Sequence, residues 1–435
     1  MKILKIIIAI VVFTCSTCIV AQEIKLNEYT FGEGLNFSTD TGNTMQITGY
    51  FQPYFESKHF TEAYDNGGLN RFRMRRARLR LDGKSSDNRF SYRFQADLTG
   101  SGEADNDLLN NYLLDAFVAY DVTKRITVSF GQRATYTDNR ELFMNSNSLQ
   151  LVERSRLTSA FSAIREFGLF IDGTFKTGKT SYVRPYFVLS NGDGQNVVGR
   201  DRGGLKVGGR LDYLPFGLFS NFGQFRQVDI VRELTPKLVI GANYSYNNGI
   251  SSRNGRESGE ILYLNAQNEE SLPDYTKIGA DFLFKYKGFS ALGEFVKSFA
   301  TVPSDITQRV RVDGSVTSSF EVNGVEDIEN YIRGRMILGE AYNIQMGYIL
   351  KSGFSIDARY TRLNADTNSF LNNGTFYNRP DYYTVGLTKY LARNYGAKIQ
   401  ADYTYINNNG GINNLQGEPI TGNEWIARII LSLAF

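Results

Sequence analysis

The sequence is poor in the residue types on which most catalytic and metal sites depend. It has one histidine, His59, and two cysteines, Cys15 and Cys18, both within the first 21 residues. General-base catalysis needs a partner that orients the imidazole, and no residue next to His59 supplies one. Zinc sites need several cysteine or histidine ligands. We therefore predict a protein that is not an enzyme and binds neither a metal nor a cofactor.

Long apolar runs are missing after Ile19, and neither sign of charge predominates. A helical membrane protein is excluded, because each spanning helix needs about 18 or more consecutive apolar residues. The formal net charge is +3, to which Lys2 and Lys5 contribute two units. Such a small charge does not predict a nucleic-acid-binding surface.

The first 21 residues have the pattern of a secretory signal peptide. Lys2 and Lys5 precede an apolar run, and the segment ends in Ile19, Val20 and Ala21. This pattern predicts export, with cleavage after Ala21. A lipid anchor on Cys15 or Cys18 is the weaker alternative, because a threonine precedes each cysteine where a small Gly or Ala is expected.

The last eleven residues, 425–435, alternate strictly and end on an aromatic side chain. All odd positions from Trp425 to Phe435 are apolar, whereas the even positions are mixed. This period of two indicates a strand with one apolar face. Such a strand suits the closing strand of an outer-membrane β-barrel, which faces lipid. An edge strand of a soluble sandwich is the alternative. A final strand ending on Phe435 also resembles the signal that barrel-assembly machinery recognises.

Similar alternation recurs along the whole chain and predicts sixteen strands. The clearest is 89–98, where apolar side chains alternate with Arg89, Ser91, Arg93, Gln95 and Asp97. Short turns alternate with long polar loops, as expected when one rim is periplasmic and the other extracellular. The exception is 215–236, which falls on the short-turn side. We interpret it as a segment along the periplasmic rim, with an extra strand as the alternative.

These observations predict an all-β protein: a transmembrane antiparallel barrel over residues 45–435 in the bacterial outer membrane, surrounded by its lipid. A short lead, residues 22–44, precedes the barrel, and we expect it to be mobile and to form no plug domain.

Several sequence strings resemble the phosphate-selective porin O and P family, in the version found in Bacteroidetes-type bacteria. The matching strings are RRARL at 75–79, FSYRFQ at 90–95, DA at 115–116, GQ at 131–132, SLQLVERS at 148–155, REFG at 165–168, SNGDG at 190–194, GRL at 209–211, PFG at 215–217 and TPKL at 235–238. The resemblance implies a homotrimer of sixteen-stranded, water-filled pores for small anions. It also implies that the third extracellular loop, 136–164, folds inward as a constriction loop.

Arginines are the candidate site residues, because guanidinium groups replace the hydration of an anion. The side-chain parity of the strands predicts that Arg76, Arg78, Arg80, Arg93, Arg133 and Arg184 line the pore. The constriction loop and its end contribute Arg140, Arg154, Arg156 and Arg165. The alternative is that these groups pair with nearby carboxylates and only pin the loop to the wall.

The function predicted from the sequence is passive diffusion of small solutes with a mild anion preference, phosphate included. Acidic residues such as Asp97 and Asp115 on the same faces argue against strong selectivity. A high-affinity phosphate or polyphosphate channel, and a non-conducting barrel that serves as an adhesion or scaffold surface, are the alternatives.

Overall fold

The structure is a computed structural model, and it describes residues 24–59, 68–100, 112–195, 202–251, 262–311, 313–372, 379–392, 394–407 and 424–435. The predicted signal peptide lies outside these residues. No helix among the described residues is long and apolar enough to span a membrane.

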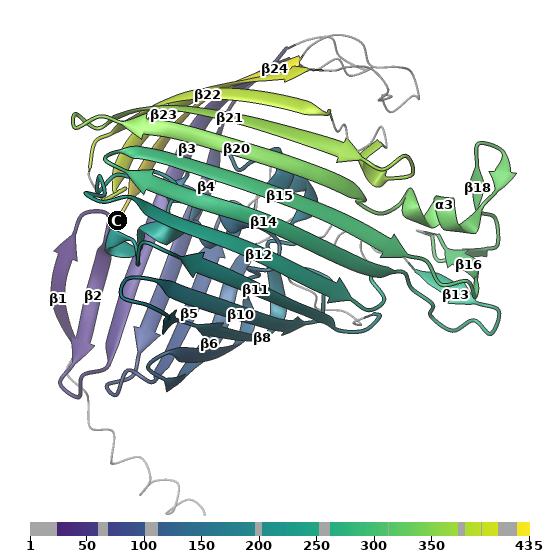
Figure 1. Cartoon of the computed structure of the whole chain (residues 1–435), viewed down its shortest axis with the longest axis horizontal. Coiled ribbons are helices and arrows are strands. Elements are labelled where there is room, and N and C mark those ends of the chain that lie inside the picture. The colour runs from purple at the N-terminus through teal and green to yellow at the C-terminus, as the bar shows by residue number, and fades with distance from the viewer. Residues whose placement is uncertain are drawn as a thin grey trace, which may run out of the picture.

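Sixteen antiparallel strands form a closed barrel, as the sequence predicts (Figure 1). The strands are β3 (Thr44–His59), β4 (Gly68–Lys84), β5 (Phe90–Asp97), β6 (Leu113–Thr123), β7 (Ile126–Ala134), β8 (Arg165–Gly173), β10 (Tyr182–Ser190), β11 (Lys206–Leu214), β12 (Lys237–Asn247), β14 (Asp274–Tyr286), β15 (Phe289–Thr301), β20 (Gly339–Ile349), β21 (Phe354–Ala365), β22 (Asp381–Tyr390), β23 (Ala397–Asn407) and β24 (Glu424–Ala434). A two-residue strand, β9 (Phe175–Lys176), follows β8 and also pairs with β10.

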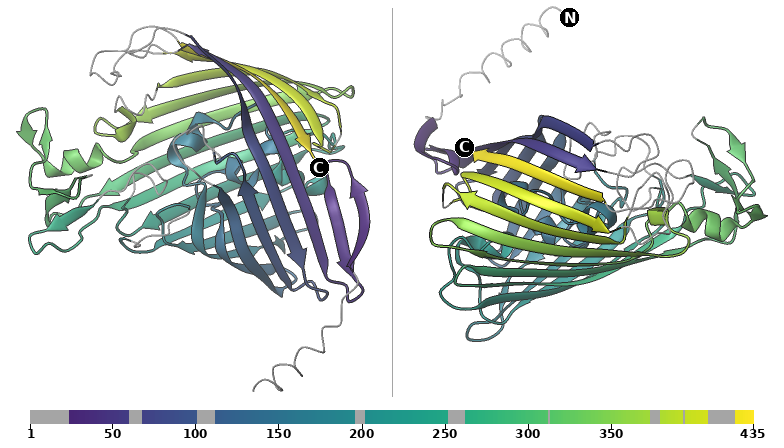
Figure 2. Two further views of the ribbon diagram at one scale, coloured as in Figure 1. Left: turned by 180° about the vertical axis from the view of Figure 1, so that it is seen from behind. Right: turned by 90° about the horizontal axis from the view of Figure 1, so that it is seen from above.

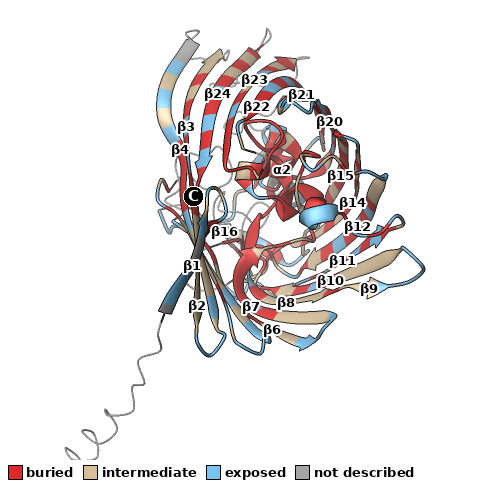
Figure 3. Ribbon diagram, turned by 90° about the vertical axis from the view of Figure 1, so that its left-hand side faces the viewer, coloured by how far each residue is buried: buried red, intermediate tan, exposed pale blue. Residues whose placement is uncertain are grey.

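The barrel closes where the last strand pairs with the first. β24 runs antiparallel to β3, with Arg428 opposite Glu56, and Phe435 exchanges two backbone hydrogen bonds with Gly49. Outward side chains such as Ile429, Leu431 and Leu433 are exposed, whereas their inward neighbours are buried. Figure 3 shows this alternation on the strands around the seam. The apolar outer face suits lipid, which explains the period of two.

The lead is structured, which corrects the expectation that it is a mobile segment. β1 (Ile24–Thr30) and β2 (Gly34–Thr39) form a hairpin, and β2 pairs with β3 from Leu35–Ile47 to Ser38–Thr44. β24 leaves this part of β3 unpaired, because its pairing ends at Tyr50. The hairpin therefore continues the sheet beside the C-terminus (Figure 2).

One long-loop region forms a small subdomain beyond the barrel rim, visible at the right of Figure 1. It contains β13 (Tyr263–Asn265), β16 (Ile306–Val310), β17 (Val316–Thr317), β18 (Glu321–Val322), β19 (Val325–Glu326) and α3 (Ile328–Arg333). Phe320, Ile332 and Met336 are buried in its apolar core. Asp327 caps α3, and hydrogen bonds from the backbone and side-chain N–H groups of Asn330 lower the pKa of Asp327.

The constriction loop lies inside the ring of strands, as predicted (Figure 3). It contains η2 (Arg140–Phe143), η3 (Ser146–Ser148) and α2 (Arg156–Phe161). The apolar side of α2 buries Leu157 and Phe161 against inward-facing Val296 and Leu363. α2 begins at the Ser155 side chain, which accepts a hydrogen bond from the Thr158 backbone N–H.

The segment 215–236, called here the rim segment, contains η4 (Ser220–Phe225) and no strand. This agrees with its interpretation as a rim rather than an extra strand. Phe219 packs against inward-facing Leu283, and Val228 packs against Tyr390 and Tyr395. The rim segment therefore contacts the inner wall at the short-turn end. A final short helix, η5 (Phe370–Asn372), packs against the cluster around α2.

Candidate functional site: the lumen and its two inward segments

A column of arginines on β4 faces the barrel interior. The pairing of β4 with β3 shifts between Gln52 and Pro53, so that Arg75 is an extra residue on β4. Such a bulge changes which side chains point inward. Arg75 and Arg76 are consequently both buried in contact with the constriction loop, although they are consecutive.

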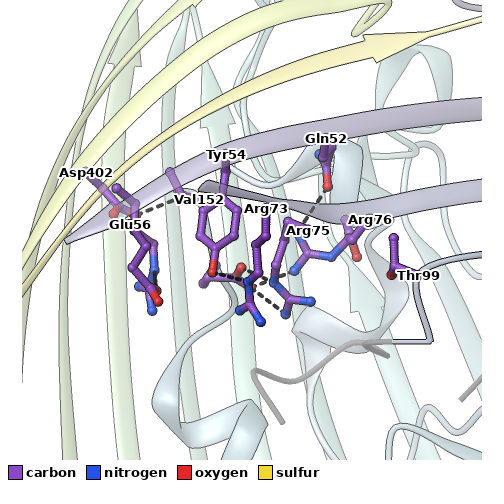
Figure 4. A network of polar contacts seen from close by, with 12 residues as sticks. Gln52, Tyr54, Glu56, Arg73, Arg75, Arg76, Thr99, Val152 and Asp402 are labelled. Atoms are coloured by element: carbon purple, nitrogen blue, oxygen red, sulfur yellow. Dashed lines mark hydrogen bonds and ion pairs between the residues drawn. The ribbon is translucent and has the colours of Figure 1, made fainter. Parts of the chain in front are cut away.

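The constriction loop is attached to this column through Glu153. Arg75 Nε donates to Glu153 Oε1 at 2.6 Å, and Arg76 Nη2 donates to Oε2 at 2.6 Å. Arg76 also donates to Gln52 on β3. Figure 4 shows Arg76 beside Gln52 and Arg73 beside Tyr54, both on the neighbouring strand. Charge-assisted hydrogen bonds of this length are strong, so the contact fixes the loop against β4.

The lower part of the column meets two aspartates. Arg78 Nε donates to Asp97 at 2.8 Å, and both side chains are buried. Arg80 and Arg93 both donate to Asp82, which leaves two guanidinium groups on one carboxylate. Their side chains remain 26% and 31% exposed. Arg80 and Arg93 thus keep contact with water, whereas Arg78 does not.

The opposite end of the loop is bound to the far wall by buried ion pairs. Arg140 donates to Asp281 at 2.6 Å and to Asp212 at 2.7 Å, and Arg210 on β11 contacts the same two carboxylates. Asp138 accepts from Lys277 at 2.9 Å. These bonds hold the loop across β11 and β14.

The remaining predicted loop arginines also bond to the protein. Arg154 donates to the backbone oxygens of Glu141 and Met144, both at 2.7 Å. Arg165, the first residue of β8, donates to Asp115 at 2.8 Å. Arg156 lies on α2 and reaches Ser159 at 3.4 Å. The structure therefore places all four loop arginines, and it gives Arg140, Arg154 and Arg165 buried anchoring bonds.

Arg133 and Arg184 lie on the wall between β7 and β10. Arg133 donates to Ser129 at 2.6 Å and to Asp172 at 3.0 Å. Arg184 is half-buried, and no carboxylate among the described residues lies within 4.0 Å of it. Its guanidinium instead lies over the rings of Tyr186 and Phe225.

Gln227 joins the rim segment to the constriction loop. Its Oε1 accepts from the Gln150 backbone N–H at 2.7 Å and from Gln345 Nε2 at 3.1 Å. Its Nε2 donates to Glu141 Oε1 at 2.9 Å. The two inward segments therefore form one connected structure within the barrel.

Two features of this site are missed by the sequence reasoning. The parity rule misses Arg71, Arg73 and Arg75, because the bulge reverses parity above Arg76. Pro53 is a usable signal, because proline within a strand often marks a bulge. The parity rule is applied to charged side chains only, so it also misses aromatic side chains that point inward, such as those of Phe117 and Phe170.

Residues 47–318, more than half of the chain, match the family model of the phosphate-selective porins O and P. The chain belongs to this family. It is an outer-membrane channel protein, and its fold and family are those of a porin rather than of an enzyme. No curated protein sequence matches it.

The solved structures similar to this porin include OprB of Pseudomonas putida, at 9% identity and a TM-score of 0.51, covering 91% of this chain and 95% of OprB. The outer-membrane channel DcaP of Acinetobacter baumannii has 12% identity and a TM-score of 0.48, with 92% and 99% covered. OmpF of Salmonella typhi, in complex with daunomycin, has 12% identity and a TM-score of 0.49, with 91% and 99% covered. At such identities the similarity to OprB concerns the fold alone.

Proposed function

We propose that this porin passes small solutes by passive diffusion with a mild preference for anions, phosphate among them. The observation that carries the proposal is the group formed by Arg80, Arg93 and Asp82. Two arginines share one carboxylate, and all three side chains remain partly exposed. A local excess of positive charge in contact with water attracts anions and repels cations.

The preference is mild because most other arginines inside the barrel bond to the protein itself and hold its segments together. Arg76, Arg78 and Arg140 are buried and bonded to carboxylates or to loop groups. A guanidinium with such bonds must lose them before it can coordinate a solute. A high-affinity phosphate or polyphosphate channel would need a series of arginines with accessible donors, and it remains the competing proposal.

A scaffold or adhesion role is the second candidate, and the subdomain at the barrel rim favours it. This subdomain has an apolar core around Phe320 that includes Tyr275 of β14, and it exposes Val325 and Glu326 at its tip. A protein with this role alone would conduct little or no current.

Homotrimeric assembly follows from the family, and we include it in the proposal. Native mass measurement of the detergent-extracted protein tests this: a mass of three chains is expected, and a mass of one chain would refute it.

Selectivity is tested by the reversal potential in a planar bilayer under a KCl gradient, repeated with millimolar phosphate. We expect the wild-type channel to be anion-selective. In Arg80→Gln the selectivity should fall about two-fold, since one unit charge about 8 Å from the ion path contributes about 0.5 kcal/mol in water. Strong block by phosphate would favour the specific channel. Cation selectivity would refute the proposal, and the absence of current would favour the scaffold.

A further inference from the structure

Arginine side chains and aromatic rings alternate along the wall formed by β5 to β10. The guanidinium of Arg93 lies 5.6 Å from the ring centre of Phe117, and Arg133 lies 5.1 Å from the same ring. Arg133 also lies over Phe170 and Tyr136. Each contact is within the range of a cation–π interaction. The wall therefore presents cations and aromatic faces together.

At the short-turn end of this wall, Arg184 lacks the ion pair that its position would allow. Asp212 stands directly opposite Arg184 in the pairing of β10 with β11. However, Asp212 Oδ1 accepts from Arg140 at 2.7 Å and from Arg210 at 2.9 Å. The next aspartate along the wall, Asp172, accepts from Arg133. The carboxylates around Arg184 are thus already occupied.

The guanidinium of Arg184 donates no hydrogen bond within the described part of the chain. Its Nε is unpaired but buried from solvent, whereas its side chain as a whole is half-buried, so the terminal Nη1 and Nη2 groups are the donors that a solute can reach. Its guanidinium lies 4.8 Å from the ring centre of Phe225 and 5.5 Å from that of Tyr186. The rings restrict the guanidinium plane without using its N–H groups. Such a group is oriented in advance for a planar anion.

Aromatic surface continues from this arginine into the constriction loop. Phe225 of the rim segment is stacked on Phe143 of the loop at 5.8 Å, and Phe143 is stacked on Tyr136 at 4.0 Å. Phe143 is buried in the middle, whereas Phe225 and Tyr136 are half-buried. Phe225 is therefore the partly exposed end of the stack that lies beside Arg184.

We propose that Arg184, together with Phe225, forms a binding site for solutes that carry a carboxylate on an aromatic ring. The inference rests on the proposed anion preference and adds a solute class to it. The carboxylate accepts two parallel hydrogen bonds from the terminal Nη1 and Nη2 groups of the guanidinium. The ring of the solute contacts Phe225, where offset or edge-on ring contacts are favourable. An anion without a ring gains only the first interaction.

The test is block of the KCl current through the purified full-length porin by benzoate, cyclohexanecarboxylate or acetate. Benzoate and cyclohexanecarboxylate have one charge each and similar size, but only benzoate is aromatic. We expect benzoate to block at a concentration about three-fold lower than cyclohexanecarboxylate and about ten-fold lower than acetate.

Three variants locate the site. Arg184→Gln should weaken block by benzoate about ten-fold, since a hydrogen-bonded ion pair is lost, and Arg184→Lys should restore only part of it. The matched control is Arg226→Gln. Arg226 is also half-buried on the rim segment, but its guanidinium lies over Tyr395. This control should change the block less than two-fold.

Equal block by benzoate and cyclohexanecarboxylate would overturn the aromatic part of the proposal. Unchanged benzoate block in Arg184→Gln, or an equal loss in Arg226→Gln, would overturn the assignment to Arg184. The reversal potential of the same channels in a KCl gradient tests the general anion preference separately. A wild-type channel that is anion-selective but shows no preference for benzoate refutes this inference and leaves the proposed function intact.

Discussion

Replacing Glu153 with glutamine tests how the constriction loop is held. The carboxylate accepts 2.6 Å bonds from Arg75 and Arg76, and its side chain is only 10% exposed. Glutamine keeps the shape but loses the charge, and its NH₂ group must face one of the two guanidinium groups. Breaking a buried ion pair by removing one partner costs about 3–5 kcal/mol. If the loop docks in two states, a cost of about 3 kcal/mol lowers the docked-to-undocked ratio by about a hundred-fold.

Two consequences are measurable in Glu153→Gln channels in a planar bilayer. Loop movement should increase the noise of the open-channel current. The anion-to-cation permeability ratio at 0.1 M KCl should rise about two-fold, since a unit charge about 8 Å from a permeating ion contributes about 0.5 kcal/mol in water. At 1 M KCl the change in selectivity should nearly vanish, because the Debye length falls to about 3 Å.

The matched control is Glu329→Gln, the same change of charge at an exposed position of α3 outside the barrel. It should alter neither noise nor selectivity. The reasoning would be refuted if Glu153→Gln channels had wild-type noise and selectivity at 0.1 M KCl, or if the control changed them equally.

Three further changes probe the remaining contacts. Gln227→Ala removes two hydrogen bonds between the inward segments and a third to Gln345 on β20. At about 1 kcal/mol for each bond, this loss should produce brief current fluctuations. A steady wild-type current would count against the connection. Leu157→Ala should destabilise the docking of α2 by about 2–5 kcal/mol, because Leu157 is fully buried against Val296. Protease cleavage within the loop should then become faster. An unchanged cleavage rate would show that this cluster does not contribute to docking. Phe435→Ala removes the ring whose centre lies 5.6 Å from that of Phe51. It should lower the amount of folded barrel in the outer membrane, measured by heat-dependent gel mobility. An undiminished amount would contradict a role of Phe435 in barrel assembly.

The outer face of the barrel could be predicted from the sequence because lipid imposes one rule on every strand. On β5, the alternation of Phe90, Tyr92 and Phe94 with polar residues is reproduced by their exposure outside the barrel. This rule acts locally, two residues at a time, so it requires no knowledge of the partner strand. The number of strands and the closing role of the C-terminal strand follow from it.

The contacts inside the barrel could not be predicted in the same way, because they join distant parts of the chain. Arg140 bonds to Asp281, 141 residues later, and Gln150 bonds to Asp357, 207 residues later. No short-range pattern encodes such pairs. The sequence supplies both charges, but only the closed barrel determines which carboxylate each arginine reaches.

A weaker signal in the sequence marks where the constriction loop docks. Inward positions of a water-filled barrel are polar, yet Leu283, Leu292 and Val296 occupy inward positions and are buried. The apolar side chains of α2 and of the loop cover this wall. By contrast, Arg80, Arg93 and Phe117 on the opposite wall stay partly exposed. Because burial under the loop removes one wall from contact with water, the groups that select solutes should be sought on the wall from β4 to β10.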